Sequence, residues 1–376
     1  MLCFIMFGCT TKTMVTPNNV VVDYETQGDR FYEQALFNAA LDSWTEALRA
    51  DPNNILIYKK RIAIYVRKQD YLSAIADLNK ILAIDPTDVE ARFERGAFSV
   101  HMNSFDQALN DFSTVIAMNP QYSEAYYGRG KIYLNQHQYI KAIEDFNAVI
   151  HAQPHHAEAQ YYRGIAYLNI KNDIKAIEDF DQILRFNPDD REALYNRGIA
   201  SLNVGKYGQA VTDFTAIIRL NPEDTLAYLN RGRALASLKE YNLAFDDFNY
   251  VIQLDPKKVE VYIDRGTLLS DQGYVEQALE DFTTAINLDS TNRDAYMSRG
   301  ITYINKGEID QAIIDLDKAI NLDSTWVNAY IYRGYSYYLN DELERAHEDL
   351  ERAINLDPQN TEARYYYRIV VKNADI

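Results

Sequence analysis

Proline occurs at a fixed interval along this chain, and that interval limits what the chain can fold into. Seven prolines follow one another every 34 residues from Pro52 to Pro256, and Pro358 lies three further intervals on. Glycine keeps the same interval at a second phase, in eight positions from Gly96 to Gly334. A period of about 20 to 50 residues indicates a tandem array of one repeated unit rather than two or three compact domains.

Ten blocks of 34 residues fit this period. Within a block, positions 4, 8 and 11 carry a large residue, a glycine and a large residue. Positions 20, 24 and 27 carry alanine, an aromatic residue or leucine, and a small or β-branched residue. Each set has the three- and four-residue spacing of one helical face, so the pattern predicts two helices per block. The blocks are 21–54, 55–88, 89–122, 123–156, 157–190, 191–224, 225–258, 259–292, 293–326 and 327–360.

The fourth block shows the repeat most completely, as SEAYYGRGKIYLNQHQYIKAIEDFNAVIHAQPHH. With Gly130, Ala142, Phe146 and Pro154 at the expected positions, it resembles the tetratricopeptide (TPR) repeat. The resemblance covers residues 21–360. It implies an all-α, right-handed superhelical solenoid of ten helix-turn-helix repeats, whose first helices line a concave groove. Residues 361–376 match a first helix alone, and we expect them to form a capping helix.

A second regularity links the two helices of a block. Position 7 is arginine in nine blocks and position 23 is aspartate in the same nine, from Arg61 with Asp77 to Arg333 with Asp349. On a helical wheel of about 100° per residue, this arginine lies at the edge of the packed face. We therefore predict a ladder of Arg–Asp pairs between helices, with a structural role rather than one in ligand binding.

Charge and motifs narrow the classes of function. The chain carries 55 acidic and 38 basic residues, a net charge of −17, whereas nucleic-acid binding needs clustered Lys and Arg. Neutral or basic protein partners remain open, although acidic residues also simply solubilise helices. No phosphate loop, nucleophile elbow or HExxH motif is present. We predict no catalytic residues and no cofactor; His151, His155 and His156 lack a further metal ligand, so we also predict no metal site.

The N-terminal segment has its own signature. Cys3 and Cys9 lie in the first nine residues, MLCFIMFGC, before a polar stretch. An apolar run ending in Gly-Cys resembles a bacterial lipoprotein signal, although only eight residues precede Cys9 and none is basic. The resemblance implies residues 1–20 as signal and flexible tether, a lipid anchor at Cys9, and a place in the cell envelope facing the periplasm. The alternatives are a frayed apolar terminus and a cytoplasmic protein.

The TPR resemblance also implies a set of groove residues, because positions 2, 5, 9, 12 and 13 of the first helix face the groove in that family. Position 5 is aromatic in four consecutive blocks and then aliphatic, as Leu229, Ile263, Met297 and Ile331. Asparagine recurs at position 13, and it also occurs at position 6, as Asn196 and Asn230. Apolar pockets with repeated amides suit an extended peptide. The same tyrosines could instead pack on the next repeat, and the asparagines could end the helix. The candidates are Phe93, Tyr127, Lys131, Asn135, Tyr161, Asn169, Tyr195, Asn196, Asn203 and Asn230.

From these features we expect a non-enzymatic scaffold that binds extended segments of a protein or peptide partner in its groove, in the bacterial cell envelope. Two alternatives remain. One is a structural spacer or assembly solenoid that acts through its ends or its convex face. The other is a cytosolic co-chaperone, which is disfavoured because positions 5 and 9 are mostly apolar rather than the Lys and Asn of a carboxylate clamp.

Overall fold

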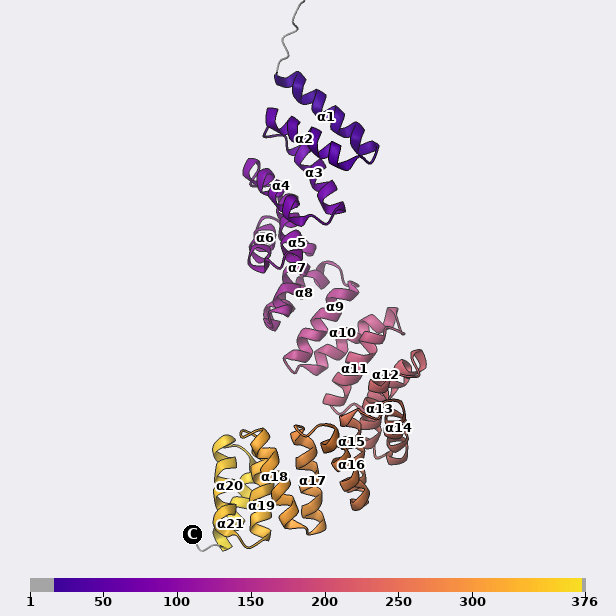
Figure 1. The fold of residues 1–376 in the computed structure, drawn as a ribbon, viewed down its shortest axis with the longest axis vertical. Helices are drawn as coiled ribbons and strands as arrows, with labels where there is room; N and C mark the ends of the chain where they lie inside the picture. Colours follow the sequence, from indigo (N-terminus) through magenta and orange to yellow (C-terminus); the bar gives the residue numbers. More distant parts are fainter. Residues whose placement is uncertain (1–16, 374–376) are drawn as a thin grey trace, which may run out of the picture. The chain divides into compact units, whose positions relative to one another are not determined.

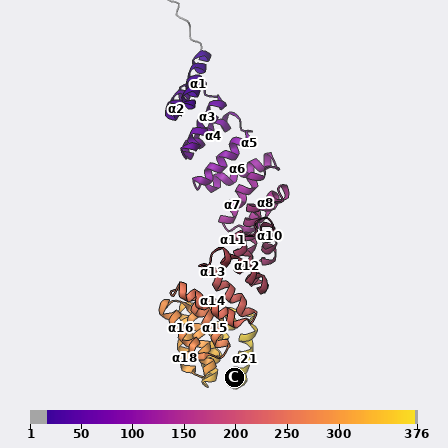
Figure 2. The same cartoon turned by 90° about the vertical axis from the view of Figure 1, so that its right-hand side faces the viewer.

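The computed structural model describes residues 17–373, and the regular elements in that range are all α-helices. They form two compact units, residues 1–172 and 173–376, each a row of consecutive helix pairs (Figure 1; Figure 2). The first unit contains α1 (Pro17–Glu33), α2 (Phe37–Ala50), α3 (Ile55–Arg67), α4 (Tyr71–Ile84), α5 (Val89–His101), α6 (Phe105–Met118), α7 (Ser123–Asn135), α8 (Tyr139–Ala152) and α9 (Ala157–Asn169). The second contains α10 (Asp173–Phe186), α11 (Arg191–Asn203), α12 (Tyr207–Leu220), α13 (Thr225–Ser237), α14 (Tyr241–Leu254), α15 (Val259–Asp271), α16 (Val275–Leu288), α17 (Arg293–Lys306), α18 (Ile309–Leu322), α19 (Val327–Leu339), α20 (Leu343–Leu356) and α21 (Thr361–Asn373).

The odd-numbered helices are the first helices of the repeats, and the even-numbered ones are the second helices. The predicted solenoid of ten helix pairs and a last single helix is confirmed. Several first helices begin at an Asp or Asn whose side chain accepts a hydrogen bond from a backbone N–H three residues on, as Asp88 does from Ala91 at 2.9 Å. Such caps satisfy an N–H that has no partner within the helix. Eight second helices end two residues before a proline, which disfavours helical geometry in the residue that precedes it. Helices α16 and α18 end at the equivalent residue, although Ser290 and Ser324 stand in place of the proline.

The turn inside each helix pair needs a left-handed residue at position 15. That residue has a positive φ in all ten pairs, among them Lys239 at 65° and Gly273 at 82°. Glycine adopts this conformation without steric cost. The three turn glycines that stand out in the sequence, Gly205, Gly273 and Gly307, therefore lie where the backbone requires them.

The core forms where the glycine at position 8 meets the aromatic residue at position 24. At Gly130, a Cβ atom would lie 2.9 Å from Cε1 of Phe146, which is fully buried. At Gly28, it would lie 2.3 Å from Cδ1 of Trp44, the bulkiest residue at position 24. The missing side chain lets the two helices of a repeat approach closely, as the sequence pattern predicted.

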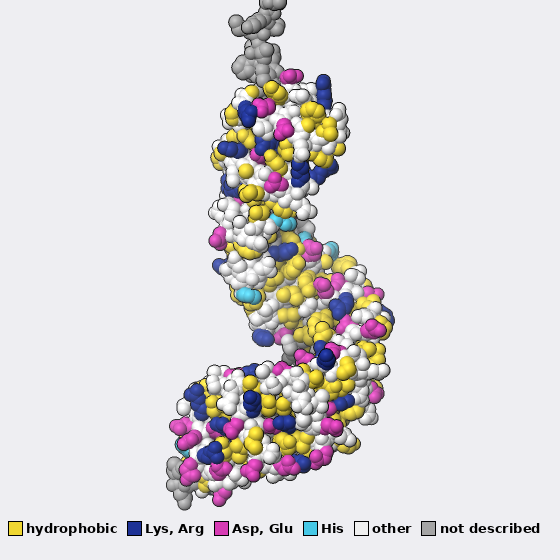
Figure 3. All heavy atoms as spheres, viewed as in Figure 1, with side chains coloured by type: hydrophobic (Ala, Val, Ile, Leu, Met, Phe, Trp, Pro, Cys, Tyr) yellow, Lys and Arg dark blue, Asp and Glu magenta, His cyan; other side chains and the backbone are white. Residues whose placement is uncertain are grey.

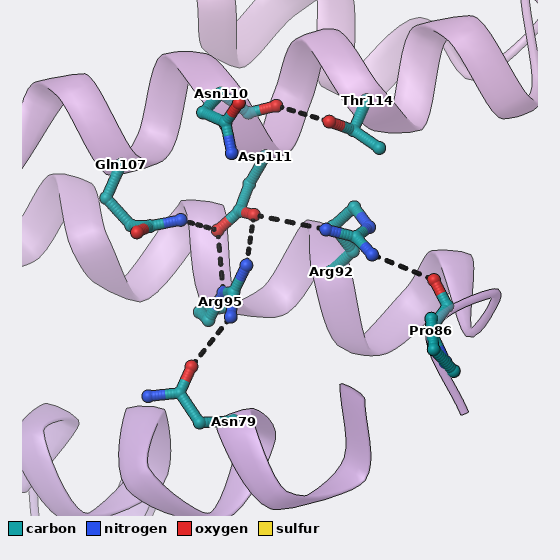
Figure 4. Close-up of polar contacts among 8 residues, drawn as sticks. All are labelled: Asn79, Pro86, Arg92, Arg95, Gln107, Asn110, Asp111 and Thr114. Carbon is teal, nitrogen blue, oxygen red and sulfur yellow. Dashed lines mark hydrogen bonds and ion pairs between the residues drawn. The ribbon is translucent and has the colours of Figure 1, made fainter. Parts of the chain in front are cut away.

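The Arg–Asp ladder is also confirmed, and it reaches further than one repeat. In Figure 4, Arg95 donates from Nε and Nη2 to the two carboxylate oxygens of Asp111, at 2.9 and 2.6 Å. Its Nη1 donates to Oδ1 of Asn79 on the preceding second helix, at 2.7 Å. Eight of the nine ladder arginines join three helices in this way. The other pairs are Arg61–Asp77, Arg129–Asp145, Arg197–Asp213, Arg231–Asp247, Arg265–Asp281, Arg299–Asp315 and Arg333–Asp349; Arg163 and Asp179 belong to different units.

Burial raises the pKa of several carboxyl groups in the Arg–Asp ladder. Removal from water raises the pKa of Asp145, Asp213 and Asp349, and the facing arginine opposes that rise. In the first unit, burial raises the pKa of Asp77 to about 6. Its Oδ2 has no hydrogen-bond partner, although Nε of Arg61 is 3.0 Å away. The carboxylate of Asp77 therefore accepts fewer hydrogen bonds than the carboxylate of Asp111 in Figure 4.

The two ends of the described chain differ from the sequence-based expectation in one respect. Helix α1 begins at Pro17, so residues 17–20 are helical rather than part of the expected tether. Proline is well suited to a first helical position, because its φ is preset and its missing N–H would have no partner there. The other end of the chain is α21, which packs on α20, with the rings of His347 and Tyr367 5.0 Å apart.

Two further points concern the N-terminal prediction. Cys3, Cys9 and the rest of residues 1–16 lie outside the described residues. None of the helices within residues 17–373 has the length and apolar character that crossing a membrane requires.

Candidate functional site

Within each unit, first helices of consecutive repeats contact one another through side chains at positions 5, 6 and 9. We call the surface formed by positions 2, 5, 6, 9, 12 and 13 the first-helix face. In the first unit, Lys60 on α3 bridges to Glu25 and Asp29 on α1, with N–O distances of 2.9 and 2.8 Å. In the second unit, Arg233 on α13 bridges to Asp264 on α15, at 2.7 Å.

One group of interacting side chains on this face lies between α7 and α9. Nζ of Lys131 lies 5.4 Å from the ring centroid of Tyr127 and 5.2 Å from that of Tyr162. The hydroxyl of Tyr127 donates to Oε2 of Glu158 at 2.7 Å. Burial and this hydrogen bond raise the pKa of Tyr127. Two of the predicted groove residues, Tyr127 and Lys131, are thus brought together, with one tyrosine and one glutamate from the next repeat.

The remaining predicted aromatic residues at position 5 are half-buried and pack against neighbouring rings. Phe93 lies 5.7 Å from Phe112 and 5.0 Å from Tyr122, and Tyr195 lies 6.0 Å from Phe214. Tyr161 stands edge-on to Tyr162 at 5.5 Å. Each ring therefore has one side packed and part of its surface accessible, which suits both the binding interpretation and the packing interpretation of position 5.

Only two of the four later residues at position 5, Ile263 and Met297, are half-buried at the surface. Leu229 is 3% exposed and Ile331 is fully buried. The aliphatic floor that the sequence suggested over these repeats is therefore interrupted. In the second unit, the half-buried residues at position 6 also contribute to the first-helix face; they are Asp264, Ser298 and Tyr332.

The predicted asparagines differ in exposure and in the hydrogen bonds that they make. Asn135 and Asn203 are exposed, and Nδ2 of Asn203 donates to Oδ1 of Asp173 at 2.8 Å. Asn169 and Asn196 each donate to a backbone carbonyl one turn earlier in their own helix. Asn230 is only 4% exposed, donates to the carbonyl of Leu226 and accepts from Arg233. Asn230 therefore has a structural contact and lies beneath the accessible part of the face.

Acidic residues follow the edge of the first-helix face at position 2. They lie in the first turn of their helices, where the helix dipole favours negative charge. Two of them accept hydrogen bonds from tyrosines, Glu158 as described and Glu90 from Tyr122 at 2.9 Å. The exposed members of this column are Glu90, Glu124, Glu158, Glu192, Glu260, Asp294 and Glu362. Elsewhere on the visible surface, acidic and basic side chains are interspersed (Figure 3).

Sequence reasoning missed several residues of this face. Tyr162 and Asp264 both occupy position 6, which falls at about 240° on the helical wheel, beside position 13 at about 220°. Their place on the helical wheel was therefore sufficient to predict both residues as part of the first-helix face. A tyrosine cluster on the last first helices was also missed, in which the rings of Tyr335 and Tyr366 are 4.6 Å apart.

The histidine cluster has a local role in the structure. Nδ1 of His156 accepts a hydrogen bond from the backbone N–H of Ala159 at 3.2 Å, so this ring caps α9. Within residues 17–373, no group of three His, Cys, Asp or Glu side chains is placed to hold a metal ion.

Comparison with protein families identifies the repeat. Models described as tetratricopeptide repeat match residues 25–89, 127–191 and 195–258, which together exceed half of the chain. Further models with the same description match residues 62–127, 259–292, 294–325 and 327–360. No curated protein sequence matches the chain.

Solved structures share the fold. Yeast Tom70 is 14% identical, with a TM-score of 0.54 over 96% of this chain and 97% of that one. The Cut9–Hcn1 hetero-tetramer of the APC/C gives 14% identity and a TM-score of 0.52, covering 93% of this chain and 76% of the other. MamA protein is 27% identical over 45% of this chain and 92% of that one, with a TM-score of 0.42. At these identities, the first two comparisons establish the fold alone.

Proposed function

The chain belongs to the tetratricopeptide repeat family, and on that premise we propose that it is a non-enzymatic scaffold that binds an extended segment of a protein partner along its first-helix face. Members of the family typically bind protein or peptide partners. The observation that carries the proposal is the cluster of Tyr127, Lys131, Tyr162 and Glu158. There, two aromatic rings, a cation and a carboxylate from two repeats lie together on one accessible surface.

The chemistry of the face supports a neutral or basic segment. Aromatic rings with one accessible side offer large contact area at low cost in conformational entropy, which is why tyrosine is frequent among binding hot spots. The acidic column at position 2 adds a negative edge. Complementary charge mainly speeds association and selects among partners, and salt screens it. We therefore expect affinity for the partner segment to fall as salt rises.

Substitution of Tyr127 and Tyr161, the tyrosines at position 5 of two consecutive repeats, tests the proposal. Peptides would be selected from a displayed random library on the wild-type protein, and their affinities measured by calorimetry. Loss of a hot-spot side chain costs about 2 kcal/mol or more, so the Tyr127→Ala, Tyr161→Ala variant should bind at least about thirtyfold more weakly. Leu72→Ala is the matched control, because Leu72 is 68% exposed on the second helix α4.

Two outcomes would contradict groove binding. Selected peptides that lose affinity for Leu72→Ala, but not for the double tyrosine variant, would place binding on the second helices. Unchanged peptide binding with an altered oligomeric mass would favour the alternative of a spacer or assembly solenoid. Competition by a peptide with a free acidic C-terminus would favour the co-chaperone alternative, which the acidic edge of the face disfavours.

We further propose that the protein is tethered in the bacterial cell envelope through Cys9. The support is the Gly8-Cys9 sequence after an apolar run. Mass spectrometry of the protein isolated from membranes of its native host should find an N-terminal peptide that begins at an acylated Cys9. An N-terminal peptide that begins at Met1 and carries no lipid would contradict the proposal and leave the cytoplasmic alternative.

A further inference from the structure

Tyrosine at position 11 has the same contact wherever it occurs in the array. Five repeats carry it, and in each the guanidinium carbon of the ladder arginine lies within 6.0 Å of the ring centroid. Such a cation–π contact stabilises both partners. The pairs are Arg61–Tyr65, Arg129–Tyr133, Arg163–Tyr167, Arg299–Tyr303 and Arg333–Tyr337, at 5.7, 5.8, 5.9, 6.0 and 5.8 Å.

In two of these repeats, a basic side chain at position 19 of the second helix also contacts this ring. Nζ of Lys141 lies 5.2 Å from the centroid of Tyr133. The guanidinium carbon of Arg345 lies 4.1 Å from the centroid of Tyr337. The ring at position 11 therefore occupies a defined space between the ladder arginine and position 19, on the side of the first helix away from the first-helix face.

In the eighth repeat this space has no ring of its own. Position 11 is Leu269, and the structure has a cleft of about 600 Å³ there, lined by Leu269, Leu268, Phe245 and Gln277. A second hollow of about 470 Å³ shares Leu269, Phe245 and Gln277 and extends to Arg265. Arg265 and Gln277 are the equivalents, in this repeat, of the arginine and the position-19 residue that enclose the tyrosine elsewhere. Volumes of about 300 to 1,000 Å³ are usual for ligand-binding pockets.

The preceding second helix lines the cleft with a bulkier side chain than most other repeats have at the same position. Position 21 is Phe245 on α14, where most other second helices have Ile, Leu or Val. Its ring centroid lies 5.7 Å from the guanidinium carbon of Arg265, and that of Tyr262 lies 5.9 Å from it. Arg265 is thus held by two rings and by Asp281 and Asn249. Its guanidinium thus lies against two rings, as that of Arg129 does against Tyr126 and Tyr133.

We propose that this cleft between α14 and α16 is a second binding site, and that it takes an aromatic side chain from a partner polypeptide. The occupant is argued from the chain itself, because the arginine equivalent to Arg265 lies against a tyrosine ring in five other repeats. The buried side chains of Leu268 and Leu269 form an apolar floor. Lys239, Glu240 and Gln272 form a polar rim that a peptide backbone can contact. The site lies outside the first-helix face and does not depend on binding there.

A small aromatic probe tests the site directly. Titration of the full chain with N-acetyl-4-fluoro-L-phenylalaninamide, followed by ¹⁹F NMR, should show saturable binding in the millimolar range. Leu269→Tyr should fill the cleft with the ring that the other repeats carry. It should therefore weaken probe binding at least tenfold and raise the melting temperature, with an unchanged far-UV circular dichroism spectrum.

A second variant should move affinity in the opposite direction. Gln277→Arg places at position 19 the residue that covers Tyr337 in the tenth repeat, and a cation–π contact of this kind should tighten probe binding about two- to fivefold. Tyr127→Ala, on the first-helix face of the other unit, should leave probe binding unchanged. The proposal is wrong if the wild type shows no saturable binding, or if Leu269→Tyr binds the probe as well as the wild type does.

Discussion

Replacing Arg197 with methionine is expected to lower the free energy of unfolding of the second unit by about 3–5 kcal/mol, because it leaves a buried carboxylate without its charge partner. Asp213 is fully buried and receives two hydrogen bonds from Arg197, at 3.0 and 2.6 Å. After the substitution, Gln209 remains as a donor to it, at 2.9 Å. Urea unfolding followed by circular dichroism measures the loss.

Two comparisons make this prediction specific. Arg197→Met combined with Asp213→Leu should recover most of the loss, because an apolar pair of similar volume often replaces a buried ion pair at little cost. Arg219→Met should cost at most about 1 kcal/mol, since Arg219 and Asp189 are 69% and 56% exposed. If Arg197→Met costs no more than Arg219→Met, the ladder does not hold the helices together.

The pH dependence of the Arg197→Met variant follows from the carboxylate. Burial already raises the pKa of Asp213 in the wild type, against the influence of Arg197, and removal of the arginine should raise that pKa further. The folded variant then binds a proton more tightly than the unfolded chain does. The difference in stability from the wild type should therefore be full at neutral pH and shrink as pH falls through the raised pKa.

Gly232→Ala is expected to lower the free energy of unfolding of the second unit by about 2 kcal/mol. The new Cβ atom would lie 2.6 Å from Cε1 of Phe248, whose ring is fully buried. Overpacking of this kind costs about 1–3 kcal/mol, and we expect the upper part of that range because the enclosed ring cannot turn aside. The gain in helix propensity of alanine over glycine, about 1 kcal/mol, offsets part of it.

The same substitution at Gly208 should have the opposite sign. Gly208 lies in the first turn of α12, and a Cβ atom there would meet nothing within 4 Å. Alanine should therefore stabilise the helix by up to about 1 kcal/mol. Both variants belong to the same unit and can be compared by their urea midpoints. Equal shifts at the two positions would show that contact with the core ring does not explain the repeated glycine.

The repeat period accounts for how much of the fold was predictable. Residues that recur at one position in many blocks have the same neighbours each time, so the helix pairs, the Gly–aromatic contact and the Arg–Asp ladder could all be derived from the pattern. The left-handed residue at position 15 shows the limit. Glycine marks it in three turns, whereas residues such as Gln69 and Lys239 adopt the same conformation without a sequence signal.

The candidate site was less predictable, because its exposure depends on pairs of residues from different repeats. Tyr127 and Leu229 share position 5, yet one is half-buried beside Lys131 and Tyr162 and the other is 3% exposed. The cleft at Leu269 likewise needs both a missing ring in one repeat and Phe245 in the repeat before it. Aligning the blocks position by position does not reveal a combination of residues from two different repeats.

The central claim is that partners bind along the first-helix face, and site-specific photo-cross-linking in living cells tests it most directly. A photoreactive phenylalanine analogue would replace Asn135 or Thr267, which are exposed on first helices, or Leu72 or Ile314, which are exposed on second helices. Binding along the first-helix face predicts cross-links to one partner from Asn135, Thr267 or both, and none from the second-helix positions. Cross-links to that partner from Leu72 and Ile314 alone would contradict the claim.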